Sequence, residues 1–363
     1  MAARFFGGTM SEAAAPARVA VIGGGNFGTV IADIVAARGH RVELWLRDAA
    51  LAAEIARRRE NPRYLAGHRL HDGVEPVTDL AEAVAGASLV FVAVPSASFE
   101  EVAAGIAPHL APGTGLLSTT KGLVPEPGAA DGAFLTMSDL LRRHCPEARI
   151  GVLSGPNIAE EIAGGSFTGT VVASPDASLR TFVQETVHSR SFRVYSNPDM
   201  QGVELAGALK NIYAIASGMS AALGAGQNTL AMLITRGLGE MSRLAARLGA
   251  DPMTFLGLAG VGDLMVTCTS PLSRNHALGR AVGEGASLAQ AQEALGRLAE
   301  GVNTISVVHR RARALGVDMP IVQGLHEILF EDKPLAEVLI RLMLAEQRDD
   351  VEFVEGARRA GGC

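Results

Sequence analysis

The sequence predicts an α/β domain, with a mostly parallel sheet covered by helices on both faces, followed by an all-α domain. Three observations carry this prediction. The chain has 363 residues, more than a single domain usually contains. Short β-rich runs alternate with helical stretches up to about residue 197. Beyond that point β-branched runs almost vanish, and long Ala, Leu, Gly and Met patterns of helical period replace them.

The first part contains short apolar runs at 18–22, 41–46, 89–94, 115–119, 149–153, 170–173 and 192–195. Several are almost continuously apolar, as strands covered on both faces are. They are separated by helical stretches that include 27–38, 49–60, 99–109 and 138–144. This alternation predicts βαβ units and therefore a parallel sheet.

The second part begins after Asn197-Pro198, with predicted helices at 202–222, 230–248, 287–300, 304–315 and 335–345. Turn signals at 249–252 and 316–320 punctuate them. We therefore expect domains at 18–197 and 198–350. Residues 1–17 are expected to form a flexible leader, in which Met10 is an alternative start to Met1. Residues 351–363 are expected to be a disordered tail.

Composition excludes several classes of protein. With 32 basic and 38 acidic residues and no long basic run, the chain is not expected to bind nucleic acid. Three scattered cysteines fit reduced thiols in the cytoplasm better than a disulfide framework. The leader has no signal-peptide core, and the most apolar window, 205–223, carries Lys210, so no membrane span is expected. No paired metal-ligand spacing occurs.

A glycine-rich turn follows the first predicted strand. Residues 23–28 read Gly-Gly-Gly-Asn-Phe-Gly and have the form GxGxxG between a strand and a helix, in a βαβ unit. In that context Gly23 permits the tight turn, Gly25 lets the backbone approach a pyrophosphate, and Gly28 lets helix and strand pack closely. A pyrophosphate is favoured there because free N–H groups and the helix dipole attract anions. The first domain is therefore predicted to be a Rossmann-type domain that binds NAD or NADP.

The end of the second predicted strand leaves the cofactor preference open. An acid at this place favours the free 2′-hydroxyl of NAD, whereas an arginine accommodates the 2′-phosphate of NADP. The sequence has both, Arg47 and Asp48, in succession. We lean only slightly towards NADP.

The scarcity of lysine points to a proton-transfer site. Hydride reduction of a ketone leaves an alkoxide that needs a proton, which lysine can supply and arginine cannot. The chain has three lysines, and Lys210 is the only charge in the helical stretch 205–215. Burial and a second ammonium lower the pKa of a lysine, and Lys121, just after a strand, is a candidate neighbour. Lys333, beside Asp332, is expected to be a surface charge.

A second polar cluster lies in the all-α part. Ser273 has the character of an N-cap for a helix that begins at Arg274. A cation in a first turn is poorly placed for the helix dipole unless an anion binds there. Arg274 is thus predicted to hold phosphate in bidentate fashion, with Asn275 as a further donor. Asp263 is expected to orient a buried ammonium or to bind a substrate hydroxyl.

Taken together, these motifs resemble the bacterial NAD(P)-dependent glycerol-3-phosphate dehydrogenases. The resemblance extends from about Arg18 to Glu346. It comprises a series of motifs in one order: the GxGxxG turn, Thr120-Lys121-Gly122, Ser154-Gly155-Pro156, 192–199, Leu209-Lys210-Asn211, 233–238, 260–263, Ser273-Arg274-Asn275 and Glu300-Gly301.

The resemblance implies roles for particular residues. Lys210 corresponds to the general acid/base at the substrate C2 oxygen, with Lys121 and Asp263 beside it in the catalytic set. The implied substrate-binding residues are Lys121, Gly155, Asn157, Lys210, Asp263, Ser273, Arg274 and Asn275. The implied cofactor-binding residues are Gly23, Gly25, Asn26, Phe27, Gly28, Arg47, Lys121, Ala159, Arg274, Leu298 and Glu300.

It also implies interconversion of dihydroxyacetone phosphate and glycerol 3-phosphate for glycerophospholipid synthesis, by a cytoplasmic homodimer. Two departures stand out: Asn157 replaces the usual Ser or Thr, and Asn303 precedes Thr304 where arginine is frequent. Two alternatives remain open. One is another lysine-dependent two-domain dehydrogenase, of 3-hydroxyacid or 6-phosphogluconate type. The other is a non-catalytic dinucleotide-sensing protein.

Overall fold

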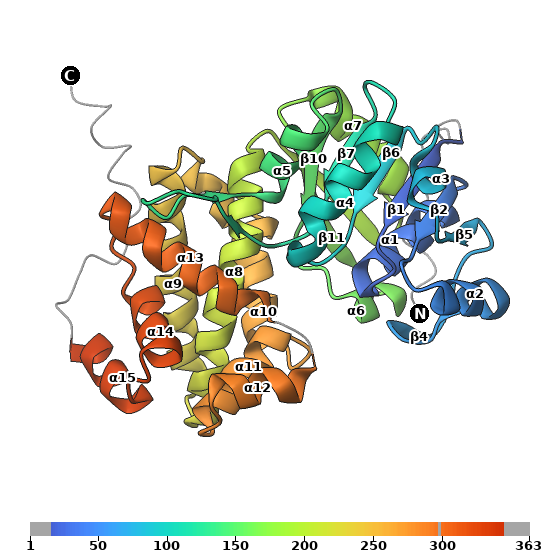
Figure 1. Ribbon diagram of the computed structural model, residues 1–363. Helices are drawn as coiled ribbons and strands as arrows, with labels where there is room; N and C mark the ends of the chain where they lie inside the picture. The colour runs from blue at the N-terminus through green and yellow to red at the C-terminus, as the bar shows by residue number, and fades with distance from the viewer. Residues whose placement is uncertain (1–15, 297–298, 345–363) are drawn as a thin grey trace, which may run out of the picture.

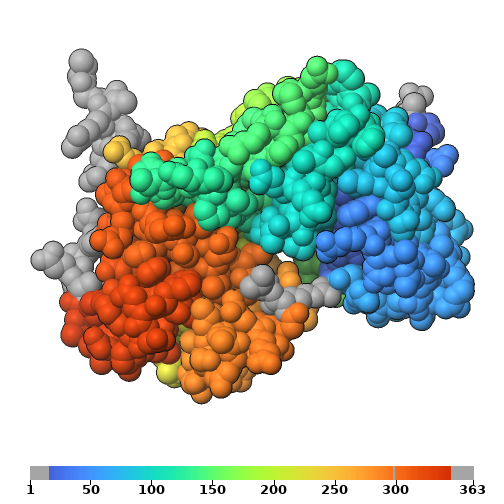
Figure 2. Space-filling view, in the orientation of Figure 1, coloured from blue at the N-terminus to red at the C-terminus, as the bar shows by residue number. Residues whose placement is uncertain are grey.

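The computed structural model describes residues 16–296 and 299–344. It consists of a sheet with surrounding helices, and beside it a group of helices built around one long central helix (Figure 1). The surface is hollowed between the two, where the first part faces α11 (Arg274–Gly283) and α12 (Leu288–Leu295) (Figure 2). The predicted fold class, a Rossmann-type α/β domain followed by an all-α domain, is confirmed.

The sheet has eight strands in the order β12-β11-β10-β7-β6-β1-β2-β5. Every neighbouring pair is parallel except β10 and β11. The strands are β1 (Arg18–Ile22), β2 (Arg41–Trp45), β5 (Val74–Val77), β6 (Leu89–Val92), β7 (Gly115–Ser118), β10 (Arg149–Ser154), β11 (Thr168–Ala173) and β12 (Phe192–Asn197).

Both faces of the sheet are covered, as the apolar runs predict. Along β1, Val19 and Val21 pack into one apolar cluster, whereas Ala20 and Ile22 pack into another. The covering helices are α1 (Asn26–Ala37), α2 (Ala49–Arg58), α3 (Leu80–Val84), α4 (Phe99–Ile106), α5 (Met137–His144), α6 (Ala159–Ala163) and α7 (Ala177–Val187). Two small hairpins complete this part: β3 (Glu60–Asn61) with β4 (Leu65–Arg69), and β8 (Val124–Pro125) with β9 (Phe134–Leu135).

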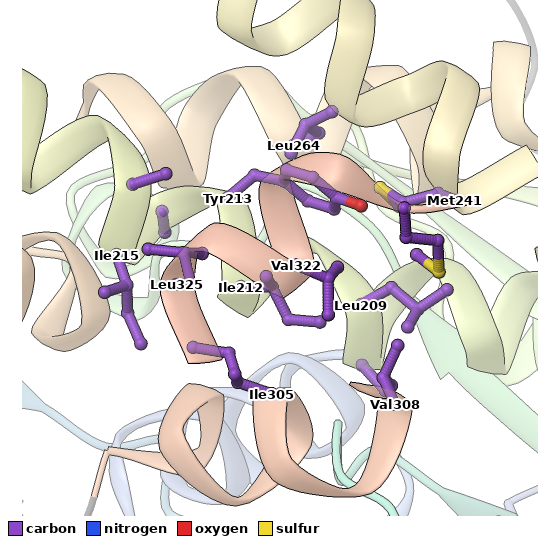
Figure 3. Packing of buried hydrophobic residues seen from close by; sticks show 14 of the residues in the cluster. Leu209, Ile212, Tyr213, Ile215, Met241, Leu264, Ile305, Val308, Val322 and Leu325 are labelled. Atoms are coloured by element: carbon purple, nitrogen blue, oxygen red, sulfur yellow. The ribbon is translucent and has the colours of Figure 1, made fainter. Parts of the chain in front are cut away.

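The helical part surrounds α8 (Met200–Ala222), which is buried on almost every side up to Met219. A helix that is apolar all round belongs in a core. Around it lie α9 (Gln227–Arg247), α10 (Asp263–Thr269), α11 (Arg274–Gly283), α12 (Leu288–Leu295), α13 (Glu300–Leu315), α14 (Pro320–Phe330) and α15 (Leu335–Leu344). Figure 3 shows Leu209, Ile212 and Tyr213 of α8 among side chains of its neighbours.

One predicted element was wrong, and one strand of the main sheet was not predicted. The helix predicted at 287–300 is not continuous: α12 ends before Gly296, which adopts a left-handed conformation, and Glu300 begins α13. Strand β5 was missed because it contains Pro76, which interrupts the strand signal, and a proline is tolerated here only because β5 is an edge strand. No helix in the described ranges is long and apolar enough to cross a membrane.

Candidate active site

The glycine-rich turn has the geometry that a dinucleotide requires. Gly23 has φ of +120°, and a Cβ there would lie 2.5 Å from the carbonyl oxygen of Ala93. A Cβ on Gly28 would lie 1.9 Å from the carbonyl oxygen of Gly23, so only glycine allows α1 to pack this closely. A Cβ on Gly25 would meet nothing within 4 Å, which leaves open space at the N-terminus of α1. These features fit a pyrophosphate.

The candidate cofactor-binding residues near this turn differ in their burial and hydrogen bonding. Asn26 donates from Nδ2 to Glu160 Oε1 at 2.6 Å, so its amide joins α1 to α6. Phe27 is half-buried against the core of the sheet. Ala159 is buried as the first residue of α6, a helix that contacts α1. The three lie beside the turn, although Asn26 is engaged within the protein.

At the end of β2 the two candidate specificity residues have different environments. Asp48 is the N-cap of α2: its Oδ1 accepts a hydrogen bond from the Leu51 amide at 3.1 Å. Its Oδ2 pairs with Arg63 Nη1 at 3.1 Å. The Leu51 amide and Arg63 hold the pKa of Asp48 below its usual value. Arg47, by contrast, is exposed.

Two of the three lysines converge on one carboxylate. Asp263, at the start of α10, is 1 % exposed. Its Oδ1 accepts from Lys210 Nζ at 2.5 Å, and its Oδ2 accepts from Lys121 Nζ at 2.6 Å. Lys121 follows β7 and Lys210 lies in α8, so this cluster joins the two parts of the molecule. The predicted proximity of these three residues is confirmed.

The electrostatics of the cluster suit proton exchange by Lys210. This side chain is buried, and burial lowers its pKa to about 8. The Asp263 carboxylate opposes that shift, and the neighbouring Lys121 ammonium reinforces it. Lys210 also donates to Thr267 Oγ1 at 2.7 Å. A lysine with a pKa near 8 can give and take a proton under physiological conditions.

Two buried asparagines connect the loops of the site. Asn211 donates to the carbonyl oxygen of Lys121 at 3.4 Å and accepts from Asn275 Nδ2 at 3.0 Å. The Oδ1 of Asn275 accepts from the Gly301 amide at 3.1 Å. Most of the hydrogen-bonding capacity of the Asn275 side chain is thus used within the protein. The chain of amides fixes the starts of α11 and α13 relative to Lys121.

The start of α11 is formed as predicted. Ser273 is its N-cap and accepts from the His276 amide at 3.3 Å. Arg274 is exposed in the first turn, and its charge acts on Glu300. Glu300 begins α13 and accepts from the Ser96 amide at 3.2 Å, across the junction of the two parts. Burial raises the pKa of Glu300, and Ser96 and Arg274 partly oppose that shift.

The turn after β10 binds Lys121 through a backbone carbonyl group. Gly155, with φ of +153°, offers its carbonyl oxygen to Lys121 Nζ at 2.9 Å. Asn157 accepts from Thr170 Oγ1 at 2.8 Å and donates to the Gly169 carbonyl at 3.4 Å, so its amide holds β11. The candidate Leu298 lies outside the described residues.

Sequence reasoning assigned no individual role to two residues of this site, Asn211 and Thr267. The turn Val94-Pro95-Ser96, by contrast, is expected from the sequence to flank the cofactor. Asn211 adjoins Lys210, and Thr267 stands one helical turn after Asp263, so spacing from the acid and the lysine was the available signal. The contact of the Ser96 backbone amide with Glu300 has no sequence signature. In the described part of the chain no group of His, Cys, Asp and Glu could hold a metal ion.

A dinucleotide turn on one domain, together with a buried, carboxylate-bound lysine on a second, helical domain, defines the class of two-domain nicotinamide-dependent dehydrogenases. Residues 18–180 match the family model "NAD-dependent glycerol-3-phosphate dehydrogenase N-terminus", and residues 199–340 match the model of its C-terminus. The chain belongs to the NAD(P)-dependent glycerol-3-phosphate dehydrogenase family. It is therefore an oxidoreductase that uses NAD or NADP.

Individual relatives agree with this assignment. The glycerol-3-phosphate dehydrogenase [NAD(P)+] of Azotobacter vinelandii is 54% identical over 93% of this chain and 97% of its own length. That of Pseudomonas entomophila is 54% identical over 93% and 96%. The crystal structure of glycerol-3-phosphate dehydrogenase from Coxiella burnetii has a TM-score of 0.84 at 35% identity, covering 91% of this chain and 99% of that one.

Proposed function

We propose that this chain interconverts dihydroxyacetone phosphate and sn-glycerol 3-phosphate, acting mainly in the direction of reduction to supply glycerophospholipid synthesis. The observation that carries the proposal is the Lys121–Asp263–Lys210 cluster, at the junction between the dinucleotide turn and the helical domain. The names of the relatives support the substrate. We further propose a cytoplasmic location, which the unpaired thiols of Cys145 and Cys268 support. We also propose a homodimer, which the family resemblance implies.

The proposed roles follow from the geometry. When bound, the nicotinamide gives a hydride to C2 of the ketone or takes it back from the alcohol. Lys210 donates the matching proton from Nζ to the C2 oxygen during reduction and recovers it during oxidation. Asp263 holds the Lys210 ammonium in place, and Lys121 adds positive charge where the alkoxide develops.

The substrate phosphate is assigned to the start of α11. Arg274 offers an exposed guanidinium there, beside the N–H groups of the first helical turn. Ser273 and Asn275 fix that turn. The carbonyl oxygen of Gly155 positions the Lys121 ammonium, and the Asn157 amide holds β11. Glu300 is assigned to the nicotinamide end of the cofactor, because it lies against Ser96 beyond β6.

The test follows nicotinamide absorbance with dihydroxyacetone phosphate and each reduced cofactor. We expect turnover with the phosphorylated ketone and none with 3-hydroxyacids or 6-phosphogluconate in the reverse direction. Folded protein that binds the cofactor but reduces no dihydroxyacetone phosphate would overturn the proposal. Turnover of an acid substrate alone would favour the hydroxyacid type, and binding without turnover would favour a dinucleotide sensor.

We further propose that the chain prefers NADP over NAD. Asp48 caps α2 and pairs with Arg63, whereas Arg47, also at the end of β2, is exposed and has no ion-pair partner among the described residues. Replacing Arg47 with serine is expected to raise KM for NADPH by roughly ten- to a hundredfold, because a charge-assisted bond to the 2′-phosphate is lost. KM for NADH should change little.

The matched control is Arg57→Ala, since Arg57 is an exposed arginine in the last turn of α2. Steady-state kinetics with both cofactors measure the effect. Equal changes in KM for NADH and NADPH in Arg47→Ser would show that Arg47 does not read the 2′-phosphate.

A further inference from the structure

A long connection links the first catalytic lysine to the helical domain. Residues 119–136, here called the strap, join β7 to α5, include Lys121 and the β8–β9 hairpin, and extend across to α13 (Figure 1). The near end of the strap is held by Asn303, which donates to the Leu123 carbonyl at 2.9 Å. Its hairpin is held by an ion pair between Asp131 and Arg311 of α13.

The far end of the strap is held by a buried carboxylate of α8. Glu204 is 5 % exposed. Its Oε1 accepts from the Ser138 amide at 2.8 Å, and its Oε2 accepts from the Ser138 hydroxyl at 2.6 Å. Ser138 is the second residue of α5, so a side chain of one domain satisfies the N-terminus of a helix in the other. No cation pairs with Glu204 among the residues that the structure describes.

Burying the Glu204 carboxylate has a free-energy cost, and the contact with Ser138 must bring a structural advantage that outweighs it. A buried carboxylate without a cation pays a desolvation cost that hydrogen bonds only partly offset. Burial accordingly raises the pKa of Glu204, against the opposing effect of Ser138. An apolar residue would fill the same space without that cost, so a directional contact between α8 and α5 is the physical gain.

Glu204 and Lys210 belong to the same helix. Six residues along an α-helix correspond to about 9 Å, a distance that a continuous buried helix keeps fixed. Fixing Glu204 to Ser138 therefore fixes the end of the strap relative to Lys210. Asn211 fixes the other end, through the carbonyl oxygen of Lys121.

We propose that Glu204 is a positioning residue for the reaction: by anchoring α5 to α8 it holds the strap so that Lys121 stays on Asp263 beside Lys210. This inference rests on the proposed function for its kinetic consequences only. Asn211 and Asn303 still hold the near end, but loss of the anchor loosens the far end of the strap and weakens the placement of Lys121 beside Lys210. Because the Lys121 ammonium lowers the pKa of Lys210, that pKa then rises above about 8. Among the described residues, the other titratable groups that interact with Lys210 are Asp263, Glu300 and the Cys268 thiol.

The test compares Glu204→Ala with a matched control, Glu240→Ala. Glu240 of α9 is also a buried carboxylate, 1 % exposed, that accepts from the amide of the second residue of another helix, Ile321 of α14, at 2.7 Å. It also accepts from Tyr213 of α8 at 3.1 Å. Glu204 lies on α8 and Glu240 accepts a hydrogen bond from α8, and each caps another helix, but of the two only Glu204 binds α5, the helix that follows the strap.

The readout is NMR of isotope-labelled lysine, which the sequence makes simple because the chain has three lysines. The titration midpoint of the Lys210 side-chain resonance, assigned with Lys210→Arg, is followed with pH. We expect the midpoint to rise in Glu204→Ala, to rise less in Ser138→Ala, and to stay at the wild-type value in Glu240→Ala. The value of kcat for dihydroxyacetone phosphate should fall about tenfold in Glu204→Ala, with little change in cofactor KM.

Glu204→Gln provides a milder variant if Glu204→Ala does not fold, because one oxygen acceptor remains. An unshifted Lys210 midpoint in every folded variant that loses the Ser138 contact would overturn the inference, even if thermal stability falls. Since the NMR titration requires no turnover, a wild-type protein that fails to reduce dihydroxyacetone phosphate would refute the proposed function and leave this result readable.

Discussion

Replacing Lys210 with alanine is expected to lower kcat for reduction of dihydroxyacetone phosphate by about a thousandfold. The reason is that a positioned general acid contributes roughly two to four orders of magnitude, and Lys210 is the buried ammonium between Asp263 and Thr267. Cofactor binding should remain, because the glycine-rich turn lies on the other domain. Stopped-flow or steady-state absorbance measures kcat, and fluorescence titration of NADPH measures binding.

Lys210→Arg is the informative control, since arginine keeps the charge but does not release its proton. It should be nearly as impaired as the alanine variant. Near-normal activity in Lys210→Arg would mean that Lys210 supplies only charge, and the proton would have to come from another group.

Lys210 is also expected to set the pH dependence of kcat. Reduction requires the protonated ammonium, so its kcat should be constant below the pKa of Lys210, about 8, and fall above it. Oxidation requires the neutral amine, so its kcat should rise through the same pH. Profiles of kcat in both directions measure this, and profiles without opposite inflections between about pH 7 and pH 9 would contradict the assignment of the proton to Lys210.

Sequence reasoning succeeded where function depends on backbone geometry or on residue scarcity. The roles of Gly23 and Gly28 follow from local steric limits, which a strand–turn–helix pattern already contains. The meeting of Lys121 with Lys210 was predictable because the carboxyl ends of parallel strands share one edge, where Lys121 follows β7. A chain that otherwise uses arginine made both lysines conspicuous.

Sequence reasoning did not identify the hydrogen-bond partners of individual polar side chains. The amides of Asn26, Asn157 and Asn275, which the family resemblance assigns to ligand binding, form hydrogen bonds with Glu160, Thr170 and Asn211 that the sequence did not indicate. An amide satisfies whichever group folding brings near it, and these partners are up to 134 residues away along the chain. Glu204 was overlooked for the same reason: its partner, Ser138, is 66 residues distant and lies in the other domain.

The second large effect is expected for Asp263→Asn. This carboxylate has 2 % exposure of its side chain and accepts from two ammonium groups. Neutralising it leaves two buried or half-buried cations facing an amide. Because breaking a buried ion pair from one side is strongly destabilising, we expect the free energy of unfolding to fall by about 3 kcal/mol. Urea titration measures this loss.

The activity should fall for a separate reason. Without the Asp263 charge, the pKa of Lys210 loses the effect that opposes burial and drops below about 8, so less of the acid form remains near neutral pH. The inflection in the reduction profile should therefore move to lower pH, opposite in sign to the shift expected for Glu204→Ala. As a control, Asp72→Asn removes an exposed carboxylate that pairs with Arg69, and such surface pairs contribute little.

A double variant separates the loss of stability from the loss of activity in Asp263→Asn. Adding Lys121→Met to Asp263→Asn removes one uncompensated ammonium, so much of the lost stability should return, whereas kcat should stay low because the proton donor is still unsupported. Recovery of both stability and kcat would mean that Asp263 serves only to neutralise Lys121. Recovery of neither would mean that the carboxylate is needed by Lys210 alone, and that Lys121 reaches it without energetic coupling.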